Sequence, residues 1–225
     1  WRAAFNSFYV AIIGCVLGLI GTCVAAYPMA YGNFYGKKLY VIIIMFTMWF
    51  NAGIVPLFLT IRQLGLYDSL WALILNSMIT AYNVVIIRSY FSSIPFSVIE
   101  SARIDGATDY RILFQLVIPL SKPVLATVAL WLIVGHWNDY LNPLVLIHSQ
   151  EHKTLQLFLK ELVLNAETST SNLASVNDAT NKGVAALSQQ LKNGVLVVSM
   201  VPMLVLYPFL QKFFVSGVML GSVKG

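Results

Sequence analysis

The sequence predicts an all-α membrane protein, in which a bundle of helices crosses the lipid bilayer several times. Of its 225 residues, 58% are hydrophobic and only 10% are charged, whereas soluble domains are about 45–50% apolar and about 25% charged. The apolar residues form long runs, and much of the charge is gathered between two of them. This composition argues against a water-soluble enzyme, a disordered chain and a nucleic-acid-binding protein. Two cysteines and three scattered histidines do not suggest a metal site.

Five stretches are apolar and long enough for membrane-spanning helices, each of which needs about 20 residues. Proline and glycine inside them are compatible with spanning helices, because neighbouring helices satisfy the freed backbone groups. We therefore expect a single transmembrane domain over residues 1–225, surrounded by membrane lipid. The expected spans are residues 8–29, 39–61, 70–87, 124–147 and 194–214.

The distribution of basic residues predicts the orientation, because Lys and Arg in short loops mark the cytoplasmic side. One side has only Arg2 and Arg62 in short segments, and its long loop over residues 148–193 is largely discounted by this rule. The other side therefore faces the cytoplasm, and it includes residues 32–38, residues 90–123 and the C-terminus. Its basic residues are Lys37, Lys38, Arg88, Arg103, Arg111, Lys122, Lys212 and Lys224.

The segment between the third and fourth expected spans, residues 90–122, is called the coupling loop below. Ser97 stands three residues before Glu100, which matches a capping box and predicts the start of a short helix. Gly106 is placed to end that helix in the left-handed conformation, and a second helix is expected after it. From the residues alone, such a loop is either an amphipathic connector on the headgroups or a helix that docks into a groove of a soluble partner.

The spacing of particular residues in the coupling loop favours docking. It resembles the EAA loop of ABC importer permeases: Glu-Ala-Ala, three residues, Gly, nine residues, then Ile, any residue and Leu-Pro. Further stretches, Ile104 to Ala107, Trp137 to Tyr140 and a tail from Tyr207 to Gly225, resemble the carbohydrate-uptake (maltose-permease G-like) branch of that family. The matching positions of the loop are Glu100, Ala102, Gly106 and Pro119, with conservative departures at Ser101, Leu116 and Ile118.

This resemblance implies a bundle of the type I ABC importer kind, with a cytoplasmic coupling-helix loop, in a bacterial cytoplasmic membrane. It implies four partners: a second permease subunit, two ATPase subunits that each grip one EAA loop, an extracytoplasmic solute-binding protein, and an oligosaccharide as cargo. ATP and Mg²⁺ then belong to the ATPases, while this chain is no enzyme and has no cofactor. Such subunits usually have six spans, so a first span is expected before Trp1. The implied ATPase-docking residues are Glu100, Ser101, Ala102, Asp105, Gly106, Ala107 and Pro119.

Polar side chains within the apolar spans are candidates for the substrate pathway, because they are costly in lipid and tend to face the bundle interior. One continuous helix would place Asn76, Thr80 and Asn83 on a single face. Aromatic faces with planar polar groups suit a sugar, although each residue could instead form a hydrogen bond between helices, worth about 0.6 kcal/mol on average. The candidates are Asn51, Asn76, Thr80, Asn83, Trp137, Asn138, Asp139 and Tyr140.

Two other functions are compatible with a polytopic helix bundle. An ion-coupled secondary transporter also has Pro- and Gly-interrupted helices, but it predicts internal repeats and several buried acids, whereas only Asp139 lies within an expected span. An ABC permease for a non-sugar solute would share the coupling loop. The resemblance of the tail favours permeases for complex oligosaccharides, including acidic ones.

Overall fold

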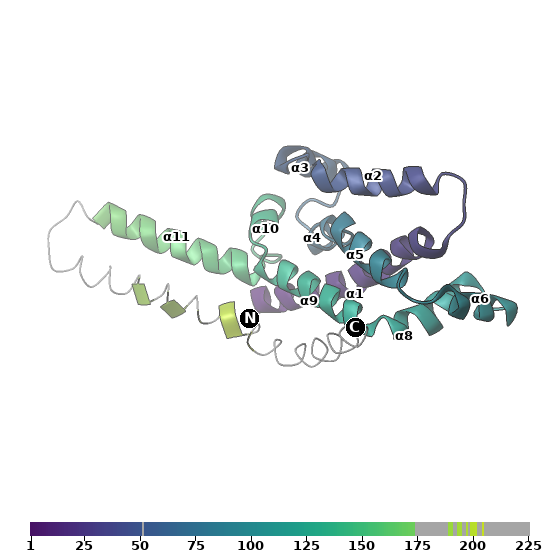
Figure 1. Cartoon of the computed structure of the whole chain (residues 1–225). Coiled ribbons are helices and arrows are strands. Elements are labelled where there is room, and N and C mark those ends of the chain that lie inside the picture. The colour runs from purple at the N-terminus through teal and green to yellow at the C-terminus, as the bar shows by residue number, and fades with distance from the viewer. Residues whose placement is uncertain are drawn as a thin grey trace.

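The computed structural model describes residues 1–50 and 52–173 and the positions 189, 190, 193, 194, 197, 199–201 and 204. Within the described residues every regular element is helical (Figure 1). The expected fifth span, residues 194–214, lies mostly outside the described residues, and the C-terminal tail lies entirely outside them. The elements are α1 (Arg2–Tyr31), α2 (Lys37–Trp49), α3 (Ile54–Gln63), α4 (Leu70–Asn76), α5 (Ala81–Phe91), α6 (Phe96–Ile104), α7 (Asp109–Ile112), η1 (Leu113–Val117), α8 (Ile118–Leu120), α9 (Lys122–Asn138), α10 (Leu141–Leu146) and α11 (Leu155–Leu173).

Helix α1 is the axis of the fold, and among the described helices it alone is long and apolar enough to cross a membrane unaided. Its 30 residues extend for about 45 Å at about 1.5 Å per residue, more than the hydrocarbon thickness of roughly 30 Å. It packs mainly against α9 and α5. Glycine permits this approach, since a Cβ on Gly14 would lie 2.4 Å from His136 Nε2 and one on Gly18 would lie 2.9 Å from the Met78 carbonyl oxygen.

The expected span over residues 39–61 is divided into α2 and α3, which are bent by 118° relative to each other. Gly53 immediately before α3 has φ +84°, which lies in the left-handed region that favours glycine. Pro56 in the first turn of α3 has no N–H, and in a continuous helix its ring would clash with the carbonyl group of Ala52. These two residues explain why hydrophobicity predicts one helix here and the structure has two.

The expected span over residues 70–87 is also divided, into α4 and α5, with a bend of 49°. Thr80 precedes α5 as its N-cap, and its Oγ1 accepts a hydrogen bond from the Asn83 N–H at 3.4 Å. Asn76 is the last residue of α4. The prediction that Asn76, Thr80 and Asn83 share one helix face is therefore wrong, because the helix stops between the first residue and the other two.

The expected span over residues 124–147 ends early, since α9 stops at Asn138 and α10 begins at Leu141, after two intervening residues. The Asp139 carboxylate accepts hydrogen bonds from the backbone N–H of Asn142 at 3.1 Å and from its Nδ2 at 2.7 Å. In an unbroken helix the ring of Pro143 would clash with the carbonyl group of Asp139. The aspartate therefore supports the start of α10 where proline prevents α9 from continuing.

The two ends of α1 are attached to segments that are far apart in the sequence. Asn6 near the start donates to the carbonyl oxygen of Glu151, whereas Tyr27 near the end donates to Asp109 and Tyr31 to the carbonyl oxygen of Phe91. Figure 1 accordingly shows α6 and α11 at opposite ends of the molecule. The coupling loop and the segment after α10 therefore lie at opposite ends of a helix that is long enough to cross a bilayer.

Candidate functional site

The first helix of the coupling loop, α6, ends in a rigid turn at Gly106. The Gly106 N–H donates to the Arg103 carbonyl oxygen at 3.0 Å and the Ala107 N–H donates to the Ala102 carbonyl oxygen at 3.0 Å. Gly106 itself has φ +78°. This pair of bonds with a left-handed glycine is a Schellman motif, so the predicted glycine ending is confirmed.

The predicted start of α6 is wrong. Its N-cap is Pro95, without a side-chain cap hydrogen bond, and Ser97 lies inside the helix. The Ser97 carbonyl oxygen accepts a bond from Ser101 Oγ at 2.9 Å, as expected of a residue within a helical turn. Proline before the helix already restricts the backbone, so the helix begins earlier than a capping box would place it.

The second half of the loop is a continuous helical stretch. It starts as an α-helix in α7, widens to a π-helix in η1 and returns to an α-helix in α8. Pro119 lies in the first turn of α8. In an ordinary α-helix its ring would clash with the carbonyl group of Gln115, and the wider π-turn before it removes that conflict. The chain then turns by 86° into α9.

The coupling loop is fixed to α1 by both apolar and polar contacts. Ile99 and Ile112 are 0% and 1% exposed and belong to the core cluster that contains Met29 of α1. Asp109 accepts hydrogen bonds from Tyr27 Oη at 2.9 Å and from the Arg103 guanidinium at 3.1 Å. The hydrogen bond to Asp109 also raises the pKa of Arg103. The sequence pattern missed Tyr27, because its partner is 82 residues away.

The residues predicted to dock an ATPase lie together on the outside of this fixed scaffold. Ala102 and Ala107 are half-buried, and the side chains beside them include two exposed apolar groups, Ile104 at 81% and Tyr110 at 75%. Exposed apolar side chains on a short helix are of the kind that can enter a groove of a partner. The exposed predicted residues are Glu100, Ser101, Asp105, Gly106 and Pro119.

A pocket of about 560 Å³ lies between the α4–α5 break and the outer half of α9. It brings together four of the predicted pathway residues: Thr80, Asn83, Asn138 and Asp139. Five further polar or aromatic groups that line the pocket were not among the predicted pathway residues. These groups are Ser77, Tyr82, Trp131, His136 and Asn142.

The other predicted pathway residues are placed elsewhere. Asn76 does not line the pocket. Trp137 is 2% exposed, its Nε1 donates to the Ser199 carbonyl oxygen at 3.2 Å, and its ring centroid is 5.1 Å from that of Phe8. Tyr140 is exposed, with Lys160 Nζ 5.7 Å from its ring centroid. Trp137 therefore contributes to packing rather than offering a face to this pocket, and Asn51 lies outside the described residues.

Helices α5 and α9 each contribute an aromatic ring and an amide to the lining of the pocket. The ring centroids of Tyr82 and Trp131 are 5.7 Å apart, and both side chains are partly exposed. Asn83 is buried, whereas Asn138 is exposed. The arrangement combines apolar ring faces with amide and hydroxyl groups, which is the chemistry that binds an uncharged, hydroxyl-rich molecule.

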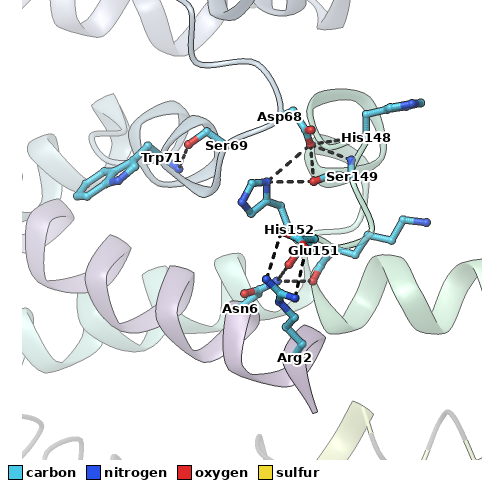
Figure 2. A network of polar contacts seen from close by, with 10 residues as sticks. Arg2, Asn6, Asp68, Ser69, Trp71, His148, Ser149, Glu151 and His152 are labelled. Atoms are coloured by element: carbon cyan, nitrogen blue, oxygen red, sulfur yellow. Dashed lines mark hydrogen bonds and ion pairs between the residues drawn. The ribbon is translucent and has the colours of Figure 1, made fainter.

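At the end of α1 opposite the coupling loop, a polar network joins three segments (Figure 2). The Asp68 carboxylate accepts hydrogen bonds from the backbone N–H groups of His148 at 2.8 Å and Ser149 at 2.9 Å. These bonds, chiefly that from Ser149, lower the pKa of Asp68. Asn6 of α1 donates to the carbonyl oxygen of Glu151 at 2.8 Å. At this end the network connects α1 and the segment before α4 with the segment after α10.

The match to a family of membrane transport proteins is consistent with this fold and this loop. Residues 12–176 match the family described as "Binding-protein-dependent transport system inner membrane component". The chain belongs to this family and is a transport permease of the ABC importer kind, an inner-membrane component. The family predicted from the coupling loop is thereby confirmed.

Several characterised relatives are similar over the whole chain. It is 37% identical over 224 residues to the protein LplC of Bacillus subtilis, covering 100% of this chain and 74% of the relative. It is 35% identical over 225 residues to the polygalacturonan/rhamnogalacturonan transport system permease protein YtcP of the same organism, covering 100% of this chain and 77% of that one.

A solved structure confirms the fold class. A chain of a bacterial ABC transporter involved in the import of the acidic polysaccharide alginate superposes with a TM-score of 0.82 at 34% identity. The similarity covers 95% of this chain and 75% of that one. The expected all-helical bundle of the type I ABC importer kind is therefore the observed fold.

Proposed function

We propose that this chain is one permease half of a binding-protein-dependent importer that carries oligosaccharides across the cytoplasmic membrane of a bacterium. A second permease completes the pathway, and two ATPase subunits, which bind ATP and Mg²⁺, dock on the cytoplasmic side. A solute-binding protein delivers the cargo to the opposite side. In this proposal the coupling loop and the C-terminus face the cytoplasm.

The geometry of the coupling loop is the observation that carries this proposal. Transmitting the closure of an ATPase dimer to the membrane requires a part that is stiff, attached to a spanning helix and exposed to the partner. The Schellman turn at Gly106 supplies stiffness, and the contacts of Ile112 and Asp109 with the α1 region supply the attachment. Glu100 and Ile104 remain exposed for the ATPase.

Substitution of Gly106 can test ATPase docking without unfolding the coupling loop. A Cβ there meets nothing within 4 Å, so Gly106→Ala is resisted only by the left-handed backbone, at about 1–2 kcal/mol, while Gly106→Asn is tolerated by that backbone. If the ATPase approaches Gly106 closely, both variants lower sugar-stimulated ATP hydrolysis of the reconstituted importer by about tenfold or more. Full activity of an assembled Gly106→Asn importer would refute the docking role.

Gly65 offers a matched control for this experiment. It has φ +70° and open space around its Cβ position, as Gly106 does, but it lies in the turn between α3 and α4. Gly65→Asn should therefore leave ATP hydrolysis unchanged. Equal losses at Gly65 and Gly106 would point to a general effect of altered turns.

The pocket between α5 and α9 is proposed as part of the sugar pathway. Its lining contains amides, hydroxyls, two aromatic rings and the single acid Asp139, and within the described residues it contains no Lys or Arg. It therefore suits the neutral hydroxyl face of a sugar. The relatives include importers of acidic polysaccharides, and with such a cargo the carboxylates would have to be paired by the second permease.

Two asparagines of neighbouring helices test the pathway. Asn83 is buried and lines the pocket, whereas Asn76 does not line it. Asn83→Ala is expected to reduce oligosaccharide uptake in reconstituted vesicles several-fold, with assembly intact, and Asn76→Ala to leave it near the wild-type rate. Equal uptake by the two variants would exclude this pocket from the pathway.

A further inference from the structure

A second cavity, of about 720 Å³, lies between the start of α2 and the last turn of α5. Three cations line it, Lys37, Lys38 and Arg88, together with apolar side chains that include Phe34, Val41 and Ile42. No acidic residue is among the described residues that line it. The cavity therefore combines a concentration of positive charge with an apolar wall, which the sugar pathway and the coupling loop do not use.

Arg88 is held in this cavity without a protein acceptor for its Nε. That atom is buried and has no hydrogen-bond partner in the part of the chain that the structure describes. A buried polar group without a partner is costly, and a planar guanidinium is suited to two parallel bonds with a phosphate. The guanidinium of Arg88, which lines the cavity together with two lysines and no acid among the described lining residues, is therefore suited to an anionic, oxygen-bearing ligand.

The two lysines surround the same space at the positive end of a helix. Lys37 is the first residue of α2, and its Nζ donates to the Gly32 carbonyl oxygen at 2.9 Å, which holds it at the edge of the cavity. Lys38 is exposed. The dipole of the 13-residue helix α2 adds positive potential at its N-terminus.

The depth and lining of the cavity match a lipid more closely than a soluble anion. The start of α2 lies on the side expected to be cytoplasmic, where it meets the headgroups. From its third residue onward, α2 exposes apolar side chains: Leu39, Ile42 and Ile43 are 54–61% exposed. A phosphate held by the cations would thus have its acyl chains directed along an apolar helix face.

We propose that this cavity binds an anionic phospholipid of the cytoplasmic leaflet. Its phosphate lies against Arg88 and the two lysines, and its acyl chains lie along Val41 and Ile42. Basic pockets between helices on the cytoplasmic side suit such headgroups. The lipid would join α2 to α5 and support the bent α2–α3 pair, which otherwise has few contacts with the remaining helices.

Lipid titration of the assembled importer tests this proposal. The importer is delipidated, then titrated with phosphatidylglycerol or phosphatidylcholine of identical chains, and bound lipids are counted by native mass spectrometry. We expect the phosphatidylglycerol to bind at least about tenfold more tightly, and Arg88→Gln to remove about that factor. Arg62→Gln lowers the charge equally in α3, away from the cavity, and should change nothing.

Other results would overturn the proposal. Equal affinity of the wild type for the two lipids would mean that only the apolar wall binds, or that the second permease fills the cavity. Displacement of phosphatidylglycerol by millimolar inorganic phosphate would identify a simple anion site. If Arg88→Gln fails to assemble, the exposed Lys38→Gln replaces it, with an expected loss of about threefold, and an unchanged affinity in that variant counts against the proposal.

Discussion

The two ends of α1 are attached to the rest of the chain by different chemistry. The end of α1 near Asn6 is called the external end, because the distribution of basic residues predicts that it faces away from the cytoplasm. There, Asn6 is 6% exposed and its amide donates to the carbonyl oxygens of Glu151 at 2.8 Å and Lys153 at 3.0 Å (Figure 2). At the coupling-loop end, the acceptor is the Asp109 carboxylate, whose side chain is 64% exposed. Hydrogen bonds of the buried Asn6 amide hold one end. The coupling-loop end combines apolar burial, one buried hydrogen bond from Tyr31 to the Phe91 carbonyl oxygen, and an exposed charged contact.

The difference shows which contacts can be exchanged with water. Breaking a buried amide-to-carbonyl bond leaves groups that water cannot reach, so the cost is high. Breaking an exposed bond to a carboxylate lets solvent replace the partner, and salt screens what remains. The external end is therefore held mainly by its polar contacts. The coupling loop is held by its core isoleucines and by the buried hydrogen bond from Tyr31 to Phe91, and it is oriented by Asp109.

The largest effect is expected from the apolar attachment of the coupling loop. Ile112→Ala creates a cavity beside α1 and should lower the free energy of unfolding by about 3 kcal/mol, because Ile112 is 1% exposed. Ile104 is 81% exposed in the same loop, so Ile104→Ala should change stability by less than about 0.5 kcal/mol. Thermal unfolding of the assembled importer measures both, and equal losses would show that burial does not hold the loop.

The polar attachment at the external end comes next. Asn6→Leu leaves the two carbonyl oxygens of Glu151 and Lys153 without this donor, and it should cost about 2 kcal/mol. Arg2→Gln breaks an ion pair with Glu151 whose side chains are 69% and 64% exposed, and should cost under about 0.5 kcal/mol. An Asn6→Leu importer that unfolds at the wild-type temperature would contradict the contrast between the two ends.

A smaller loss is expected at the orienting contact of the coupling loop. Tyr27→Phe removes one donor to Asp109 and should cost about 1 kcal/mol. Because Asp109→Asn weakens the same contact, the double variant should be less destabilised than the sum of the two single variants. Strict additivity in a double-mutant cycle would mean that the hydroxyl and the carboxylate do not interact in the assembled importer.

The smallest effect is a pH dependence at the external end. The pKa of Asp68 is lowered, first by the Ser149 backbone N–H, so its stabilisation is complete above the unfolded-state pKa of about 3.9. It is lost as the pH falls through the lower folded-state value. Asp68→Asn keeps a side-chain oxygen that can accept the hydrogen bonds, and asparagine tolerates the φ of +59° at this position. The substitution should therefore remove this part of the acid sensitivity. If the stability of the wild type and of Asp68→Asn falls in parallel between pH 5 and pH 3, Asp68 is not the source of this pH dependence.

The coupling loop was largely predictable because its decisive features are local. The glycine that ends α6 and the proline in the first turn of α8 act on residues within one helical turn, and both are visible in the sequence. The start of α6 was misplaced because both Pro95 and Ser97 can stand at the N-terminus of a helix. Residue spacing alone does not show which of the two starts it.

The pocket was predictable only in part. Polarity inside apolar runs selected four residues that line the pocket, Thr80, Asn83, Asn138 and Asp139. Periodicity assumed a continuous helix and therefore grouped Asn76 with Thr80 and Asn83. The break that separates Asn76 from Thr80 lies against α1, where Gly18 leaves no room for a Cβ beside the Met78 carbonyl oxygen. A contact between residues so far apart in the chain is not contained in the spacing of either segment.

By itself, the sequence determined that the protein belongs in a bilayer, which segments are apolar enough to lie there, and which loop carries the EAA-like pattern. Hydrophobicity, charge placement and turn chemistry are properties of short segments, so no packing is needed to infer them. The tertiary structure decided where the spans bend, which polar groups share a pocket, and how Tyr27 and Asn6 attach the two ends of α1. These features depend on close packing between helices that are far apart in the sequence. The packing of each helix depends on all of its neighbours, so it cannot be inferred from one segment alone.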